Sequence, residues 1–116
     1  MLLVLAAACG SAEHKAEKAR DELQSWAATG AVLSRTWARG DAAPRYVKST
    51  LKVASDSLQG LTKPLQGDDK SEKSLARVTQ LYDTFERAFE QNDRAAARKT
   101  ADQLDAISKD LQQQKQ

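Results

Sequence analysis

The 116-residue chain has few of the side chains on which most cofactor and metal chemistry depends. It contains one cysteine, one histidine and one methionine. A single cysteine excludes an internal disulfide, and a structural zinc site needs about four cysteine or histidine ligands. The Cys-x-x-Cys-His motif of covalent haem and the Glu-x-x-His pairs of di-iron bundles are absent. We therefore expect no metal and no cofactor.

Patterns of catalytic residues are equally scarce. His14, the only histidine, lies with Glu17 and Asp21 among charged residues that are typical of a solvated helix face. No serine or cysteine has a histidine that could activate it from the core, and no glycine-rich phosphate-binding loop occurs. The sequence predicts a protein that is not an enzyme.

Five glycines and two prolines leave long stretches without helix-breaking residues. Alanine, leucine, glutamine, lysine and acidic residues dominate these stretches, and they favour helices. Apolar residues recur there at alternating spacings of three and four, the pattern of amphipathic helices that pack together. The four seams comprise Ala16, Ala19, Leu23, Trp26, Gly30, Leu33 and Trp37; Val47, Leu51, Ala54, Leu58 and Leu61; Leu75, Val78, Tyr82, Phe85 and Phe89; and Ala97, Thr100, Leu104, Ile107 and Leu111.

Capping and turn residues separate these seams. The first helix is expected between a Ser11 cap and Arg39-Gly40, and the second after a cap at Asp41. Asp69-Lys70-Ser71-Glu72 has capping-box spacing and predicts the start of the third helix. Asn92-Asp93 predicts a tight turn before the fourth.

The predicted fold class is all-α, an antiparallel up-down-up-down four-helix bundle formed by one domain. In the alternative, the last two helices run through Asn92 as one long helix, which gives a three-helix bundle. Gly30 lies within the first seam, where it predicts a close helix crossing; a kink is the other interpretation.

The chain opens with an apolar run, Leu2 to Ala8, that narrows from large to small residues and stops at Cys9-Gly10-Ser11. This segment resembles the end of a bacterial lipoprotein signal peptide, in which a cysteine becomes the lipidated N-terminus. The resemblance implies that Ala6-Ala7-Ala8-Cys9 is the lipobox and Cys9 the lipidated residue. Ala6 takes the place at which the family prefers leucine, and no basic stretch precedes the apolar run.

The resemblance also implies an organisation and a location. Residues 1–8 would be a signal-peptide remnant, 9–11 a lipid anchor and tether, and 12–116 the bundle domain. Cys9 would hold the protein at a membrane of the cell envelope, facing the periplasm, and at the outer membrane if there is one. In the alternative, residues 2–8 begin the first helix and Cys9 is a buried thiol. The run is too short to span a membrane, which takes about 20 apolar residues.

Two clusters toward the far end of the bundle are candidate binding sites. Residues 31–65 carry six basic residues against two acidic ones. Five of the basic residues form a possible stripe for an anionic partner: Arg35, Arg39, Arg45, Lys48 and Lys52. Four aromatic residues gather at the same pole and could line a pocket for a small apolar ligand: Trp37, Tyr46, Phe85 and Phe89. The structural alternatives are a solvated face for the stripe and core packing for the aromatic residues.

The sequence therefore predicts a lipid-anchored helical protein that acts through contacts with an unidentified protein partner, as a scaffold, adaptor or accessory subunit. We expect no nucleic acid partner, because an exported protein does not meet one. A carrier of a small apolar ligand and a cytosolic helical adaptor are the alternatives, and the oligomeric state stays open.

Overall fold

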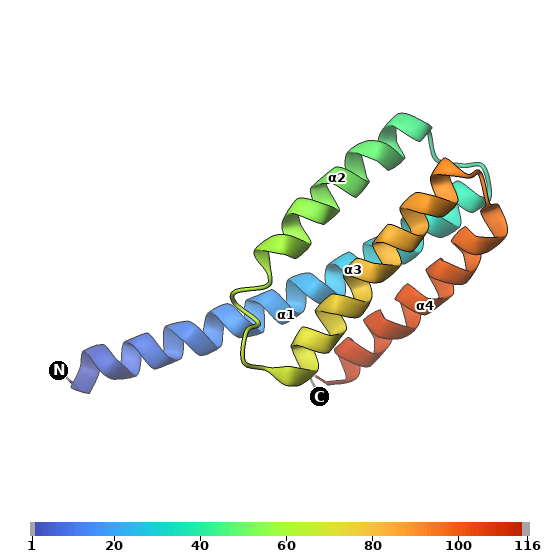
Figure 1. Cartoon of the computed structure of the whole chain (residues 1–116). Coiled ribbons are helices and arrows are strands. Elements are labelled where there is room, and N and C mark those ends of the chain that lie inside the picture. The colour runs from blue at the N-terminus through green and yellow to red at the C-terminus, as the bar shows by residue number, and fades with distance from the viewer. Residues whose placement is uncertain (1, 115–116) are drawn as a thin grey trace.

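A computed structural model describes residues 2–114, with the surroundings of the side chains described from Glu13 onward. Its four helices form the predicted up-down-up-down bundle (Figure 1). The alternative with one long C-terminal helix is wrong, because the chain leaves the helix at Glu90 and begins another at Arg94. The helices are α1 (Leu2–Ala38), α2 (Pro44–Gly60), α3 (Asp69–Glu90) and α4 (Arg94–Gln113).

Two helices end with a residue in the left-handed conformation, as the sequence predicts. Gly40 has φ of 84°, and its N–H donates to Trp37 O at 2.9 Å at the end of α1. Asn92 has φ of 55°, and the next residue donates to Ala88 O at 2.8 Å at the end of α3. Such bonds satisfy carbonyls that lack a partner within the helix. Asp93 then caps α4 by accepting a bond from the Ala96 N–H at 3.0 Å.

Three predicted helix starts are wrong in detail. Helix α1 begins at Leu2, so Ser11 lies inside it and does not cap it. Helix α2 begins at Pro44 with Ala43 at the N-cap, because the N–H of Asp41 instead completes the end of α1 by donating to Thr36 O. Asp68 rather than Asp69 precedes α3.

Small side chains hold α1 against α4. Ala27 and Ala31 of α1 are buried, as are Ala97 and Ala101 of α4. Helix α1 contacts α4 far more extensively than it contacts any other helix, whereas α2 makes only limited contacts with α1 and α3. The closest packing in the bundle is therefore that of α4 against α1 and, less extensively, against α3, whereas α2 lies along α1 and α3.

Gly30 lies where α1 closely approaches Tyr82 of α3 and Leu104 of α4. A Cβ atom built on Gly30 would lie 2.8 Å from the ring and hydroxyl of Tyr82 and 2.9 Å from a methyl group of Leu104. The Tyr82 hydroxyl donates to the carbonyl of Trp26 at 2.5 Å, one turn before Gly30. The predicted close crossing is confirmed, and α1 continues through this position as one helix.

The N-terminal end of α1 extends past the other helices, at the pole where α2 ends and α3 begins (Figure 1). A helix of 37 residues is about 55 Å long, which accounts for the longest dimension of the molecule, 58 Å. The opposite pole holds the ends of α1 and α3 and the starts of α2 and α4.

Substituting Gly30 should destabilise the bundle. In Gly30→Ala the added methyl group would overlap Tyr82 and Leu104, and overpacking of this kind costs about 1–3 kcal/mol. The higher helix propensity of alanine offsets about 1 kcal/mol of that. Gly60→Ala is the matched control, because nothing lies within 4 Å of its added carbon. In urea unfolding, the midpoint of Gly30→Ala should be lower than that of the wild type, whereas the midpoint of Gly60→Ala should not be lower. Equal midpoints for the two variants would refute the close crossing.

Tyr82 should make stability fall at high pH. Burial raises the pKa of Tyr82 above its usual value, so the unfolded chain loses this proton first, near pH 10. The free energy of unfolding should therefore fall as the pH rises above 10, by at most about 1.4 kcal/mol per pH unit from this group. Tyr82→Phe should be less stable by about 1 kcal/mol at pH 8, and the deficit should shrink by pH 11. A deficit that stayed the same between pH 8 and pH 11 would contradict this prediction.

Candidate functional site

Three of the four predicted pocket residues form a packed aromatic cluster. The ring centroid of Trp37 lies 6.0 Å from that of Phe85 and 5.4 Å from that of Phe89, in edge-to-face arrangements. Trp37 and Phe85 are buried, and Phe89 is half-buried. Such pairs add about 0.5–1.5 kcal/mol beyond the burial of their surface. These rings fill one another's space and belong to the core.

Arg94, the first residue of α4, covers the outer side of this cluster. Its guanidinium lies 4.8 Å from the centre of the Trp37 ring and donates to the Trp37 carbonyl at 2.5 Å. The positive charge of Arg94 is unfavourable at the N-terminus of α4, where the helix dipole is positive. It is favourable beside the last carbonyls of α1, where the dipole is negative. Sequence reasoning missed Arg94 because its partners belong to another helix.

Tyr46 does not join the other aromatic residues. Its side chain is 61% exposed and lies on the side of α2 next to α1. There it lines an open groove of about 390 Å³ between the two helices. The prediction of a four-residue pocket is corrected at this residue, because the rotation of α2 about its axis turns Val47 rather than Tyr46 toward the core.

The groove between α1 and α2 is apolar and carries no charged side chain. Its lining residues are Ala28, Thr29, Val32, Leu33, Thr36, Ala42, Tyr46 and Thr50. Val32 is 62% exposed, and Val53, on the Tyr46 side of α2 by helical spacing, is 52% exposed. We call this surface the uncharged strip and define it as Thr29, Val32 and Thr36 of α1 with Tyr46, Thr50 and Val53 of α2.

The sequence contains a signal for this strip. Charged residues make up 29% of the chain, yet residues 23–34 contain none. The buried seam of α1 explains only part of this run, since Thr29 and Val32 are exposed. A charge-free stretch that extends beyond the buried face marks an uncovered surface rather than a core.

The predicted basic stripe is divided among three places. Arg35 points toward α4 and pairs with Asp102 at 3.1 Å. Arg39 pairs with Asp41 at 3.6 Å. The other three members, Arg45, Lys48 and Lys52, are exposed along α2. The structure therefore groups these three on one helix and assigns Arg35 a partner within the bundle.

The basic face of α2 lies on the α3 side rather than on the uncharged strip. Ser55, at helical spacing from Lys48 and Lys52, lines a small recess together with Asp83 and Glu86 of α3. Arg45, Lys48 and Lys52 are exposed, which agrees with a solvated face.

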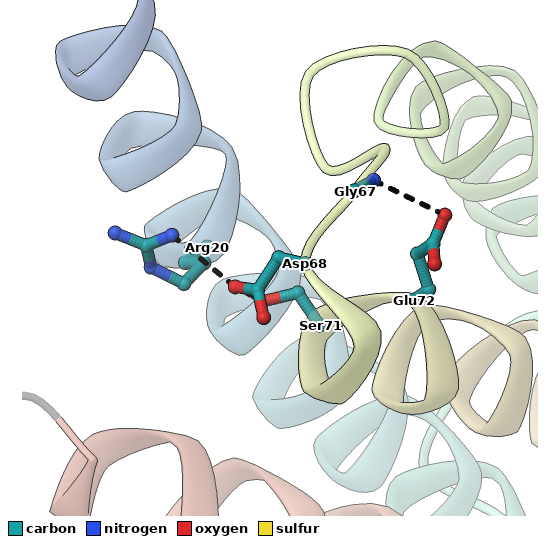
Figure 2. A network of polar contacts seen from close by, with 5 residues as sticks. All are labelled: Arg20, Gly67, Asp68, Ser71 and Glu72. Carbon is teal, nitrogen blue, oxygen red and sulfur yellow. Dashed lines mark hydrogen bonds and ion pairs between the residues drawn. The ribbon is translucent and has the colours of Figure 1, made fainter.

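A polar network joins α1 to the start of α3 at the pole nearer the N-terminus (Figure 2). Arg20 pairs with Asp68 at 3.5 Å, and the Ser71 hydroxyl donates to the same carboxylate at 2.6 Å. The bond from Ser71 holds the pKa of Asp68 below its usual range. Glu72 accepts from the Gly67 N–H at 3.4 Å. These contacts join the loop before α3 to α1 and to the first turn of α3, and Asp68 occupies the N-cap position of α3 without a side-chain capping bond.

Cys9 lies outside the part of the chain whose side chains are described. Within the described residues, no group of three His, Cys, Asp or Glu side chains is placed to hold a metal ion, and no helix is long and apolar enough to cross a membrane. Comparison with known families, curated proteins and solved structures finds no match.

The contact between Arg94 and α1 should contribute measurably to stability. Arg94→Leu keeps an aliphatic stem but removes the charged bonds to the end of α1, which should lower the free energy of unfolding by about 1–2 kcal/mol. Arg98→Leu, at an exposed position one turn later, is the control. In a Trp26→Phe background, the fluorescence of Trp37 should change only in Arg94→Leu. Equal stability of the two variants would contradict the contact.

Proposed function

We propose that the protein is a lipid-anchored helical bundle of the cell envelope that acts through protein–protein contacts made by its uncharged strip. The observation that carries this proposal is the groove between α1 and α2, with Val32 and Tyr46 exposed on a surface that is otherwise densely charged. Exposed apolar surface of this kind is characteristic of protein contacts.

The position of the strip supports this role. Val32 follows Cys9 by 23 residues along one continuous helix, a separation of about 35 Å. A lipid on Cys9 would therefore leave the strip well clear of the membrane surface. The N-terminal end of α1, which extends past the other helices in Figure 1, would form the stalk.

The contacts of the aromatic residues favour this function over a carrier. A carrier at the aromatic pole needs space between the rings, whereas Trp37, Phe85 and Phe89 pack against one another. The lipobox-like segment favours an envelope location over a cytosolic adaptor. The proposal combines this segment with the strip, and each part can fail separately.

One experiment addresses both parts. The protein is expressed in bacteria from its own upstream DNA, with a photo-reactive phenylalanine derivative at Val32 or, as the control, at the exposed Ala76 of α3. After irradiation, we expect a membrane-bound chain that begins at Cys9 and carries acyl mass. We also expect a protein adduct from position 32 and not from position 76.

Two outcomes would contradict the proposal. A chain without acyl mass would refute the anchor. Equal yields of adduct at positions 32 and 76 would refute the uncharged strip as a docking surface.

A further inference from the structure

We infer that helix α2 is a detachable cover: it swings away from the bundle as one unit, while α1, α3 and α4 stay packed. The closed cover buries an apolar face of α1 and α3, and the open cover exposes that face. This inference goes beyond the proposed docking function and does not depend on a lipid anchor. Four features of the structure lead to it.

The first feature is the kind of contact that holds α2. Among residues 13–114, no hydrogen bond or ion pair joins a side chain of α2 to another helix. Contacts of this kind do join the other three helices. The Tyr82 hydroxyl of α3 bonds to the Trp26 carbonyl of α1, and Arg94 of α4 bonds to the Trp37 carbonyl. Apolar contacts alone therefore hold α2 in place.

The second feature is the small buried face of α2. Four of its 17 residues are buried: Val47, Leu51, Ala54 and Leu58. Its only aromatic residue, Tyr46, is exposed. Helix α3 buries seven of its 22 residues, and these include the rings of Tyr82 and Phe85. Burial of apolar surface is the main stabilising term in folding, so α2 is held by less of this term than α3.

The third feature is that both flanks of α2 are hollowed. A groove of about 390 Å³ separates α2 from α1, and a recess of about 60 Å³ lies between α2 and α3. Side chains that line such hollows lack packing partners on one side and lose the dispersion attraction that those partners would supply. Helix α2 also makes no contact with α4. Its packing against the bundle is therefore incomplete on each side.

The fourth feature is the chain at the two ends of α2. Ala43, just before the helix, and Gly60, at its end, are both exposed, and nothing lies within 4 Å of a Cβ atom added to Gly60. The backbone can therefore turn at these residues without displacing a packed side chain. Beyond them the chain is fixed, because the N–H of Asp41 bonds to the end of α1 and Leu61 and Leu65 are buried. Hinges are typically a few residues at the ends of an element.

The open state exposes one face of α1 and α3 and leaves their mutual contacts intact. Leu33 of α1 and Tyr82 of α3 are buried and line the two hollows beside α2, so both become exposed when α2 leaves. The bond from Tyr82 to the Trp26 carbonyl and the bond from Arg94 to α1 do not involve α2. Opening of one such unit requires less free energy than unfolding of the whole domain.

A thiol-labelling experiment tests the inference. The full chain carries Cys9→Ser and one new cysteine, either Ala54→Cys in α2 or, as the matched control, Ala101→Cys in α4. Both alanines are fully buried, so dithiobis(nitrobenzoate) reaches the cysteine only when the chain opens. Two hydrogen bonds of ordinary net strength, such as those of Tyr82 and Arg94, change an equilibrium about 30-fold. Relative to the unfolded chains, we therefore expect position 54 to react about 30-fold faster than position 101.

Low concentrations of urea distinguish the opening of α2 from unfolding of the whole bundle. The effect of urea on an opening equilibrium scales with the surface that becomes exposed. Opening of α2 exposes less surface than global unfolding. Urea should therefore accelerate labelling at position 54 less steeply than labelling at position 101.

Hydrogen exchange of the unsubstituted chain gives an independent measurement, because it adds no sulfur atom to the core. The backbone amides of residues 51–58 in α2 should be about 30-fold less protected than those of residues 78–85 in α3. If Ala54→Cys loses helical circular dichroism, this comparison decides the question by itself.

Each measurement has an outcome that would overturn the detachable cover. Equal labelling rates at positions 54 and 101, or the same urea dependence at both, would show that α2 opens only when the whole bundle unfolds. Equal protection of the α2 and α3 amides would show the same. The proposed function is tested separately, by the acyl mass and by the adduct at position 32.

Discussion

The close approach of α1, α3 and α4 at Gly30 is the constraint on which the other features of the bundle depend. The absence of a side chain at Gly30 lets the ring of Tyr82 and the methyl groups of Leu104 occupy the space beside the backbone of α1. The Tyr82 hydroxyl then bonds to the Trp26 carbonyl, which fixes α3 along and around α1. Alanines at neighbouring positions of α1 and α4 extend the same short separation in both directions. Close packing of this kind leaves little tolerance for added volume.

Helix α2 lies outside this crossing. It contacts α1 and α3 and makes no contact with α4. Its buried seam, which includes Val47 and Leu58, faces these two helices. One flank of the helix and the outer face of α1 remain uncovered and form the uncharged strip. The surface that we propose for docking thus lies on the part of α1 and α2 that no other helix covers.

Contacts between helix ends keep the two poles in register. At one pole, Arg94 of α4 bonds to the last carbonyls of α1 and covers Trp37. At the other, Arg20 of α1 meets Asp68, which precedes α3 (Figure 2). Both arginines join elements that are far apart in the sequence. Each helix end is therefore stabilised partly by its own capping residues and partly by a neighbouring helix.

Apolar spacing, Gly40 and Asn92-Asp93 predicted the approximate extent and antiparallel order of the helices, because these signals act over a few residues. The break between α3 and α4 and the close crossing at Gly30 were each one of two interpretations, and the packing of Tyr82 and Leu104 beside Gly30 settles the second. Three features appear only in the folded bundle: Arg35 pairs with Asp102, Tyr46 turns away from Trp37, and Asp68 rather than Asp69 precedes α3. These outcomes depend on the rotation of each helix about its axis and on side chains of other helices. Local spacing does not encode them, so the basic stripe and the aromatic pocket could be proposed as sets but not assembled from the sequence.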